Sequence, residues 1–190
     1  MSKIIGISGA IGSFSEEATN YYCNKYKTIL DYKIEYLISV ENVLDALEKE
    51  QIDYGIFPIE NSNGGIVIES VYAMSKHLFN IDKMFEIDVR HCLIAKPDMK
   101  MENITLIASH DQALKQCKMY LKRIWPNIEI KEWQDTADSV RALRDGELPP
   151  NTAVIASGRA AKIYGMEILE EGIQDLKFNF TTFLLVSKFK

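Results

Sequence analysis

The sequence has few cysteines and no long hydrophobic run, and each absence removes a class of protein. Its three cysteines, Cys23, Cys92 and Cys117, are far apart and odd in number, so a disulfide framework or a zinc site is not expected. We expect three buried thiols in a reducing cytosol. No apolar run approaches the ~18 residues that span a bilayer, and no signal peptide is expected, because the residues from Met1 to Gly6 lead directly into a strand pattern. These absences predict a cytoplasmic protein with no membrane partner.

A nucleic-acid partner and a cofactor are also not expected. The net charge is −5 over 190 residues, which disfavours binding to a polyanion. The same charge means that an anionic substrate needs locally placed donors. The first glycine-rich turn lacks the Gly-Lys-Ser/Thr of a phosphate loop, and the sequence has no nucleotide-binding fingerprint and no metal-ligand cluster. We therefore expect no nucleic acid, no metal and no cofactor.

What the sequence does contain is a repeated unit of strand, polar turn and capped helix. The unit occurs about five times, which is typical of the α/β class. Because 47% of the residues are hydrophobic, the chain can bury one large core or two smaller ones. Capped turns occur in both halves, so we expect two lobes with a cleft. The expected strands are 3–8, 32–38, a strand from residue 54, 83–87, 89–95, 105–108, 128–133, 152–156 and the end of the tail; the expected helices are 14–26, 40–51, 66–77, 109–125, 136–145 and 158–164.

Some helix ends carry clear signals. Ser39 precedes an apolar stripe at helical spacing that includes Val43 and Leu47. Ser157 precedes the helix 158–164, and Gly165 follows it in the place of a helix-ending glycine. These positions are expected to begin and end helices.

The stretch from Tyr54 to Ile66 is the centre of the pattern. It begins as a buried strand, which Pro58 is expected to end because proline has no N–H to donate. Glu60, Asn61 and Ser62 follow at once, before a pair of glycines. A strand that stops at a polar turn before a helix is where open α/β sheets bind ligands. The alternative is an ordinary turn with solvated polar residues, and the sequence alone leaves both open.

Two further strand-to-helix junctions expose backbone N–H groups. Ser13 and Glu16 have the spacing of a capping box after two glycines, and Ser109 is expected to be the N-cap of a helix that runs to Trp125. Free N–H groups at a helix start favour an anion. Ordinary capped helices are the alternative. His110 is a candidate general base, but no Ser, Cys or carboxylate partner for it is identifiable in the sequence.

Five segments together resemble one family, prephenate dehydratase, the enzyme of phenylalanine synthesis. They occur in the family's order and span nearly the whole chain. The segments are Gly12-Ser13-Phe14-Ser15-Glu16-Glu17-Ala18; Pro58-Ile59-Glu60-Asn61-Ser62 with Gly65; Ser109-His110-Asp111-Gln112-Ala113-Leu114 with Gln116-Cys117; Ala153-Val154-Ile155-Ala156-Ser157 with Ala160-Ala161 and Tyr164-Gly165; and Asn179-Phe180-Thr181-Thr182-Phe183.

The resemblance implies a fold and a domain organisation. It implies an α/β, two-lobed fold like the type II periplasmic binding proteins, with a central cleft that holds the active site. The lobes would be joined by two crossings, and the last strand would return to the first lobe. We expect residues 1–80 with 170–190 to form the first lobe and 81–169 to form the second. The family commonly carries a C-terminal ACT regulatory domain, which is expected to be absent because the chain ends at Lys190; the resemblance also suggests a homodimer.

The resemblance further implies a reaction in which prephenate loses CO2 and water to give phenylpyruvate. Thr181 takes the place of the family's catalytic threonine, and its hydroxyl would donate a hydrogen bond to the departing hydroxyl group. Glu60 is expected to orient its neighbours, since a bare carboxylate would repel a dianion. The residues expected to bind the substrate are Ser13, Glu60, Asn61, Ser62, Ser109, Gln112, Asn179, Thr182 and Phe183.

Two positions depart from the family pattern. The tail motif is Asn-x-Thr-Arg-Phe, and Thr182 stands where the family has Arg; Asp111 stands where the family usually has Pro. An Arg would be a natural clamp for a substrate carboxylate, and Thr cannot replace it. Arg90 or Arg159 is a candidate substitute.

The missing Arg keeps other functions open. They are a related lyase, either arogenate dehydratase or a prephenate decarboxylase, and a non-catalytic module that binds a small molecule. A purely structural protein is disfavoured, because polar motifs at strand ends have no packing reason to occur together.

Overall fold

The computed structural model describes residues 2–189 and consists of two α/β units, each built on its own sheet. Unit 1 comprises the chain up to Ala10, Phe14–Asp88 and the chain from Phe180 on; unit 2 comprises Ile11–Ser13 and Val89–Asn179. The units divide the chain at residues 88/89 and 179/180, later than the expected 80/81 and 169/170. The reason is pairing, since residues 81–88 bond along their length to the last strand of unit 1.

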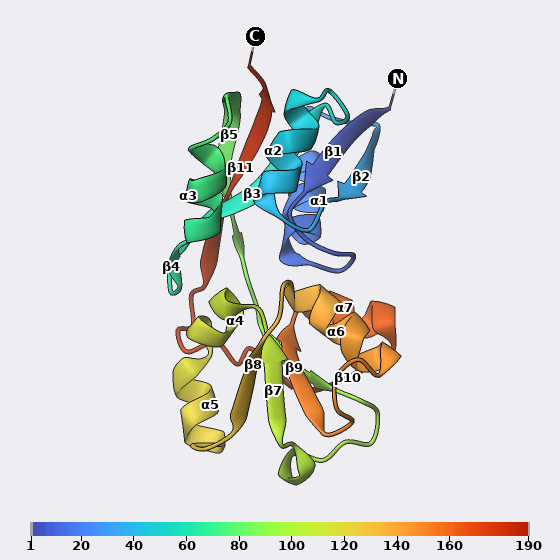
Figure 1. Ribbon diagram of the computed structural model, residues 1–190, viewed down its shortest axis with the longest axis vertical. Helices are drawn as coiled ribbons and strands as arrows, with labels where there is room; N and C mark the ends of the chain where they lie inside the picture. Colours follow the sequence, from blue (N-terminus) through green and yellow to red (C-terminus); the bar gives the residue numbers. More distant parts are fainter. Residues whose placement is uncertain (1, 190) are drawn as a thin grey trace. The chain divides into compact units, whose positions relative to one another are not determined.

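The sheet of unit 1 has the strand order β2-β1-β3-β11-β5, with the short β4 paired to β3. β1 is parallel to β2 and β3, whereas β11 is antiparallel to both of its neighbours. The last strand of the chain therefore lies inside the sheet, between β3 and β5 (Figure 1). The strands are β1 (Lys3–Ile7), β2 (Tyr32–Tyr36), β3 (Tyr54–Asn61), β4 (Gly65–Ile66), β5 (Phe79–Asp88) and β11 (Phe180–Lys188).

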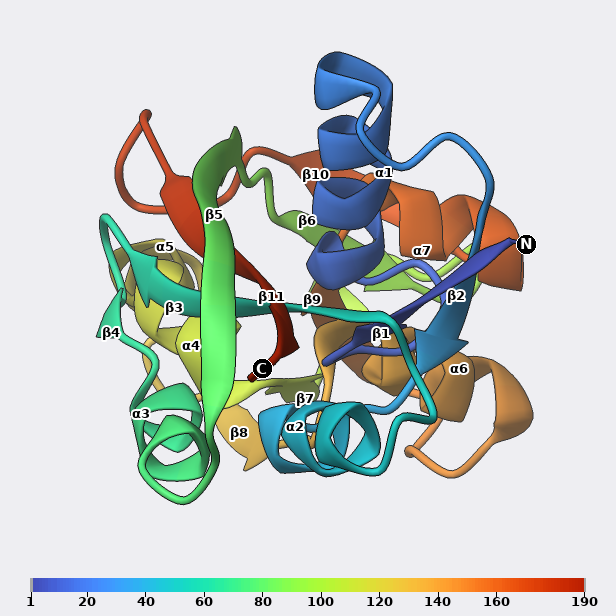
Figure 2. The ribbon, with the colours of Figure 1, turned by 90° about the horizontal axis from the view of Figure 1, so that it is seen from above.

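Helices cover both faces of this sheet. α1 (Phe14–Tyr26) lies on one face, and α2 (Val40–Glu48) and α3 (Ile68–Met74) lie on the other (Figure 2). The apolar stripe predicted for α2 is confirmed, because its members are buried against β3 and β11. Its predicted cap is confirmed too, since Ser39 Oγ accepts a hydrogen bond from the N–H of Asn42.

The prediction that Pro58 ends its strand is wrong. β3 continues through Pro58 to Asn61. The pairing with β11 shifts register here, so that Phe183 lies opposite Pro58 and Thr182 opposite Glu60. Ile59 is thus an extra residue on β3, which is the definition of a bulge, and a bulge tolerates the missing N–H of proline.

The sheet of unit 2 has the order β10-β6-β9-β7-β8. β7 is parallel to β8 and β9, and β6 is antiparallel to β9 and β10. The three inner strands are buried at every position, as expected for strands that are covered on both faces. The strands are β6 (Cys92–Ala95), β7 (Leu106–Ser109), β8 (Glu129–Glu132), β9 (Thr152–Ala156) and β10 (Glu167–Glu171).

Two helices of unit 2 begin at short polar side chains that cap them. Asp135 accepts from the N–H of Asp138. Ser157 accepts from the N–H of Ala160, as predicted. Gly165 ends the last of these helices with φ of 66°, a conformation that glycine adopts without strain. The helices of unit 2 are the 3-10 turn Met101–Asn103, α4 (Asp111–Gln116), α5 (Lys118–Ile124), α6 (Thr136–Asp145) and α7 (Gly158–Tyr164).

The single helix expected from Ser109 to Trp125 is instead two helices that meet at Cys117. The carboxylate of Asp175 explains the break. It accepts hydrogen bonds from the N–H groups of Met119 and Tyr120, both at 2.8 Å, and so acts as the N-terminal cap of α5. A partner 56 residues away in the chain competes with the continuous helix.

The cysteine prediction is confirmed for the thiols themselves. Cys23, Cys92 and Cys117 are buried, and none of them forms a disulfide. Burial raises the pKa of the Cys117 thiol far above its ordinary value, so it stays protonated and inert. Within residues 2–189, no helix has the length and apolar character needed to cross a bilayer.

Candidate active site

Thr181 and Asn61 form a hydrogen-bonded pair across two neighbouring strands of unit 1. They lie directly opposite each other on β11 and β3, and Asn61 Nδ2 donates to Thr181 Oγ1 at 2.9 Å. Both side chains are nearly buried, with exposed fractions of 7% for Thr181 and 3% for Asn61. The predicted catalytic threonine therefore has a partner in the predicted polar turn.

The orientation of the Asn61 amide follows from its other contacts. Its Oδ1 accepts hydrogen bonds from the backbone N–H groups of Asn63 at 2.8 Å and Gly64 at 2.7 Å. Since those two groups can only donate, the oxygen must face them and the NH2 must face Thr181. The hydroxyl oxygen of Thr181 is thus an acceptor in this pair, and its proton is left for another acceptor.

Ser62 fixes the start of β11. Its N–H donates to the carbonyl of Phe180 at 2.8 Å, and its Oγ accepts from the N–H of Phe180 at 3.0 Å. Asn61 Nδ2 reaches the same carbonyl at 3.2 Å. The polar turn after β3 therefore holds the residue that precedes Thr181, which supports a positioning role for Asn61 and Ser62. Their predicted contact with substrate stays a prediction.

Thr182 points to the opposite face of β11 from Thr181, because successive side chains of a strand alternate. It lies between two carboxylate residues, opposite Glu60 on β3 and Glu86 on β5. Its Oγ1 donates to Glu86 Oε1 at 3.3 Å. An Arg in this place would lie between two carboxylates on the face away from the Thr181 hydroxyl. This placement supports a cross-strand ion-pair role for the position rather than the expected substrate clamp.

Phe183 is part of the core of unit 1. Its ring is 1% exposed and stacks on Phe85 with centroids 6.0 Å apart. This placement supports a packing role rather than substrate contact. The residue predicted from the resemblance as a ligand contact instead fixes β11 against β5.

Asn179 joins the two chain segments that connect the units, because it bonds to Val89 where each segment enters unit 2. It is fully buried. Its carbonyl accepts from the N–H of Val89 at 2.7 Å, and its Nδ2 donates back to the carbonyl of Val89 at 3.0 Å. The same Nδ2 donates to Gln116 Oε1 at 2.8 Å. The side chain thus ties both crossings to α4, and its predicted contact with substrate stays a prediction.

Gln116 and His91 complete this cluster, and the sequence motifs indicated a role for neither of them. Gln116 Oε1 lies 2.7 Å from His91 Nε2. Because this oxygen only accepts, the ring nitrogen must carry the proton. Burial lowers the pKa of His91 to about 4, although the bond to Gln116 opposes that shift. His91 is therefore a neutral donor, and only its place directly before the apolar run Cys92–Ala95 marked it as unusual.

The junction after β7 differs from the prediction, because Ser109 is not the N-cap of α4. Ser109 is the last residue of β7 and is buried, and its hydroxyl donates to the carbonyl of Ile155 on β9 at 2.6 Å. His110 is the N-cap instead, with Nδ1 accepting from the N–H of Gln112 at 3.3 Å. Within the described chain, no donor reaches the buried Oε1 of Gln112. That unsatisfied acceptor supports the prediction that Gln112 contacts a ligand.

The segment Ile11–Ser13 is tied to α7 of unit 2. Ser157 Oγ donates to the carbonyl of Gly12 at 2.7 Å, and Tyr164 donates to the carbonyl of Ile11 at 3.2 Å. Gly12 has φ of 87°, and a Cβ there would lie 3.0 Å from the Cα of Ala160, so only glycine fits. Ser13 is buried in this segment.

The candidate residues thus fall into two sets. Glu60, Asn61, Ser62, Thr181, Thr182 and Phe183 belong to unit 1, whereas Ser13, Ser109, Gln112 and Asn179 belong to unit 2. Arg90 and Arg159, the candidate substitutes for the missing Arg, are exposed residues of unit 2. The shared cleft stays a prediction.

The chain is similar to known proteins in sequence and in structure. The family model described as prephenate dehydratase matches residues 5–190. Arogenate dehydratase/prephenate dehydratase 6, chloroplastic, of Arabidopsis thaliana is 36% identical over 148 residues, which cover 78% of this chain and 36% of that protein. The chain therefore spans little more than a third of the length of this relative.

Two solved structures show the fold. The prephenate dehydratase of Arthrobacter aurescens, solved in complex with L-Phe, superposes with a TM-score of 0.83 at 24% identity, over 98% of this chain and 61% of that one. A putative methionine-binding lipoprotein of Bacillus subtilis superposes with a TM-score of 0.55 at 10% identity, over 98% and 83%. The expected fold, like that of the type II periplasmic binding proteins, is confirmed.

Proposed function

This chain belongs to the prephenate dehydratase family, and we propose that it converts prephenate to phenylpyruvate, the dehydration step of L-phenylalanine biosynthesis. The observation that carries the proposal is the hydrogen bond from Asn61 to Thr181. It leaves the hydroxyl proton of Thr181 available to a departing hydroxyl group. The family membership and this donor together support a hydro-lyase.

The reaction requires a hydrogen-bond donor for the departing hydroxyl group, and it requires no nucleophile from the protein. The bond between the ring and its carboxylate breaks to release CO2, and its electron pair enters the ring as the ring hydroxyl departs. With one proton from solvent, the products are phenylpyruvate, CO2 and water. Aromatisation drives the step, so the protein has to stabilise the departing oxygen as it gains negative charge.

Thr181 is suited to that task as a hydrogen-bond donor. A threonine hydroxyl is a weak acid, so its role is to stabilise the leaving oxygen rather than to transfer a proton fully. Asn61 keeps the hydroxyl oxygen occupied, which directs the proton away from the Asn61 amide. Because both side chains are almost excluded from water, the bond is stronger than the same bond in solvent.

Arogenate is the second candidate substrate. Several relatives are named arogenate dehydratases, among them arogenate dehydratase 3 of Arabidopsis thaliana. Arogenate undergoes the same loss of CO2 and water but carries an amino group in place of the keto group. The donor at Thr181 serves either substrate equally, so its geometry does not separate them.

The test is turnover by the purified chain with each substrate. Phenylpyruvate from prephenate is read by its alkaline absorbance, and phenylalanine from arogenate by chromatography. Thr181→Val removes the hydroxyl at nearly constant volume and should lower kcat by about 10²-fold or more, whereas Thr181→Ser should retain most of it. A folded wild-type chain that turns over neither substrate would contradict the proposal, and Thr181→Val activity near that of wild type would contradict the role of the residue.

We also propose a reducing compartment, the cytoplasm, as the site of action. The buried free thiols of Cys23, Cys92 and Cys117 support it. Localisation of a tagged full-length protein tests it.

A further inference from the structure

Unit 1 has a hollow at the end of its sheet remote from Thr181. It lies where β3 begins and β11 ends, with Tyr54 opposite Ser187 in the register that also sets Asn61 opposite Thr181. These two pairs are seven positions apart along β3, or roughly 20 Å at about 3.3 Å per residue. The hollow is therefore separate from the catalytic hydroxyl.

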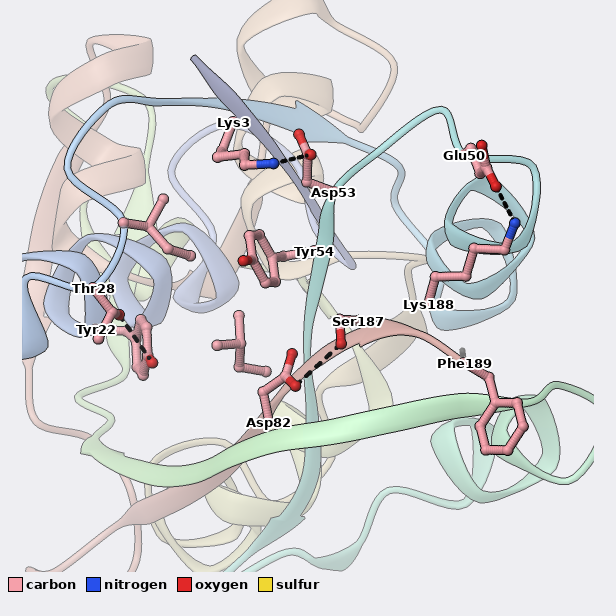
Figure 3. A pocket seen from close by; sticks show the side chains of 12 residues that line it. Lys3, Tyr22, Thr28, Glu50, Asp53, Tyr54, Asp82, Ser187, Lys188 and Phe189 are labelled. Atoms are coloured by element: carbon pink, nitrogen blue, oxygen red, sulfur yellow. Dashed lines mark hydrogen bonds and ion pairs between the residues drawn. The ribbon is translucent and has the colours of Figure 1, made fainter. Parts of the chain in front are cut away.

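The hollow has the size of a small-molecule site. Its volume is about 710 Å³, within the range of about 300–1,000 Å³ that such sites occupy. Its apolar wall consists of Tyr22, Ile29 and Leu185, which are almost completely buried, and of Phe189, which is exposed. Tyr54 also lines the hollow, and Figure 3 shows its ring extending from β3 toward the side of Tyr22.

Most charges around the hollow are already paired. Lys3 Nζ lies 2.6 Å from Asp53 Oδ1, and Lys188 bonds to Glu50. These bonds lower the pKa of both carboxyl groups, so both pairs are ionic at neutral pH. Neither lysine is left to attract an anion.

Asp82 differs from the other charged residues that line the hollow, because it is not part of an ion pair within residues 2–189. It accepts a hydrogen bond from the hydroxyl of Ser187 at 3.1 Å. Figure 3 shows this carboxylate pointing toward Ser187, and Tyr54 lines the same hollow. Among residues 2–189 the lining has two positive and three negative residues, with the excess negative charge on Asp82.

We propose that this hollow binds a small organic cation, a primary amine that carries an aromatic ring, with its ammonium on Asp82 and its ring against Tyr54. The ammonium gains the ion pair that the protein does not supply, and the face of Tyr54 attracts a cation as well as an apolar ring. An anion of the same shape meets the excess negative charge. This proposal is independent of the proposed function, since none of these residues belongs to the candidate active site.

Titration of the 15N-labelled chain with 2-phenylethylamine, followed by amide chemical shifts, tests the proposal. Saturable shifts are expected at residues 54, 82 and 187, with a Kd of about 1 mM or lower. Asp82→Asn should raise the Kd about tenfold. Glu129→Gln, which removes the same charge from an exposed position on β8 of unit 2, should leave it unchanged.

Two comparison ligands separate the contribution of the ammonium group to binding from that of the aromatic ring. 3-Phenylpropionate keeps the ring and reverses the charge, and ethylamine keeps the charge and lacks the ring; both should bind at least about tenfold more weakly. Equal binding of 3-phenylpropionate, an unchanged Kd in Asp82→Asn, or no saturation with 2-phenylethylamine at about 10 mM would each overturn the proposal. If Asp82→Asn does not fold, the proposal is tested by the binding of the two comparison ligands to the wild-type chain.

Discussion

Asn61 donates a hydrogen bond to Thr181 across 120 residues of sequence, and its own oxygen is held by two backbone N–H groups of the turn that follows it. The arrangement gives Thr181 one defined hydrogen-bonding state. Its oxygen accepts, and its proton points elsewhere. The catalytic competence we assign to Thr181 therefore depends on the amide of Asn61.

Asn61→Asp keeps the shape of the side chain but removes the amide group that donates to Thr181. The aspartate keeps the acceptor for Asn63 and Gly64, but its second oxygen cannot donate to Thr181, so the threonine proton turns toward the carboxylate. We expect kcat to fall about 10²-fold with KM within about threefold, and the fold to persist. Steady-state kinetics with circular dichroism measures both. An active Asn61→Asp enzyme would show that the proton of Thr181 is not needed.

Thr182→Arg should act on stability rather than on turnover. The new guanidinium would lie between Glu60 and Glu86 on the face of β11 away from Thr181. Cross-strand ion pairs at exposed sites contribute about 0.2–1 kcal/mol, so a small rise in the free energy of unfolding is expected, lost in high salt. Thr182→Gln is the matched control without charge. A tenfold or larger gain in kcat/KM for Thr182→Arg alone would restore the clamp interpretation.

Asn179→Ala should destabilise unit 2. It removes the donor for the carbonyl of Val89 and for Gln116 Oε1, both of which are buried acceptors. Loss of such a donor costs about 1–3 kcal/mol. Urea unfolding measures the change. Stability equal to that of wild type would mean that water replaces the amide at this position.

His91 gives the stability of the chain a defined pH dependence. Its pKa is lowered in the folded state, from 6.5 to about 4, so the unfolded chain binds the proton first as pH falls. The stability from neutral His91 is complete above pH 6.5 and is lost as pH falls toward 4, by on the order of 3 kcal/mol. Urea unfolding between these pH values should show the slope, and His91→Gln should lack most of it. The same slope in His91→Gln would assign the effect to other groups.

Short-range signals were enough to predict much of the fold. The stripe of α2, the caps Ser39 and Ser157 and the terminating Gly165 all depend on residues within one or two turns of helix, and the structure has each of them. Local periodicity also indicated most of the strands. These features follow from neighbours in the chain, so the sequence contains them directly.

The errors came from partners distant in the sequence. Pro58 stays in β3 because β11 shifts its register there, and the helix breaks at Cys117 because Asp175 caps the second half. The hydroxyl of Ser109 is taken by the carbonyl of Ile155 rather than by α4. No local pattern reports such competition, since each partner is tens of residues away.

In the candidate site, too, local motifs indicated individual residues, whereas the contacts between distant residues required the structure. Asn61 and Thr181 were both marked by their motifs, but only the register of β3 with β11 shows that one holds the other. Gln116 was part of a matching segment without a role, and its bonds to His91 and Asn179 become visible only in three dimensions.

The place of β11 in its sheet has a consequence for how the protein is made. Residues 89–179 of unit 2 are continuous and contain all the strands of its sheet, so this sheet can close without β11. The sheet of unit 1 stays incomplete until β11 is added, because β3 and β5 each lack a neighbour on the side that β11 occupies. The strand that completes this sheet also brings Thr181. A folding chain therefore places the Thr181 hydroxyl beside Asn61 in the same event that completes the sheet of unit 1.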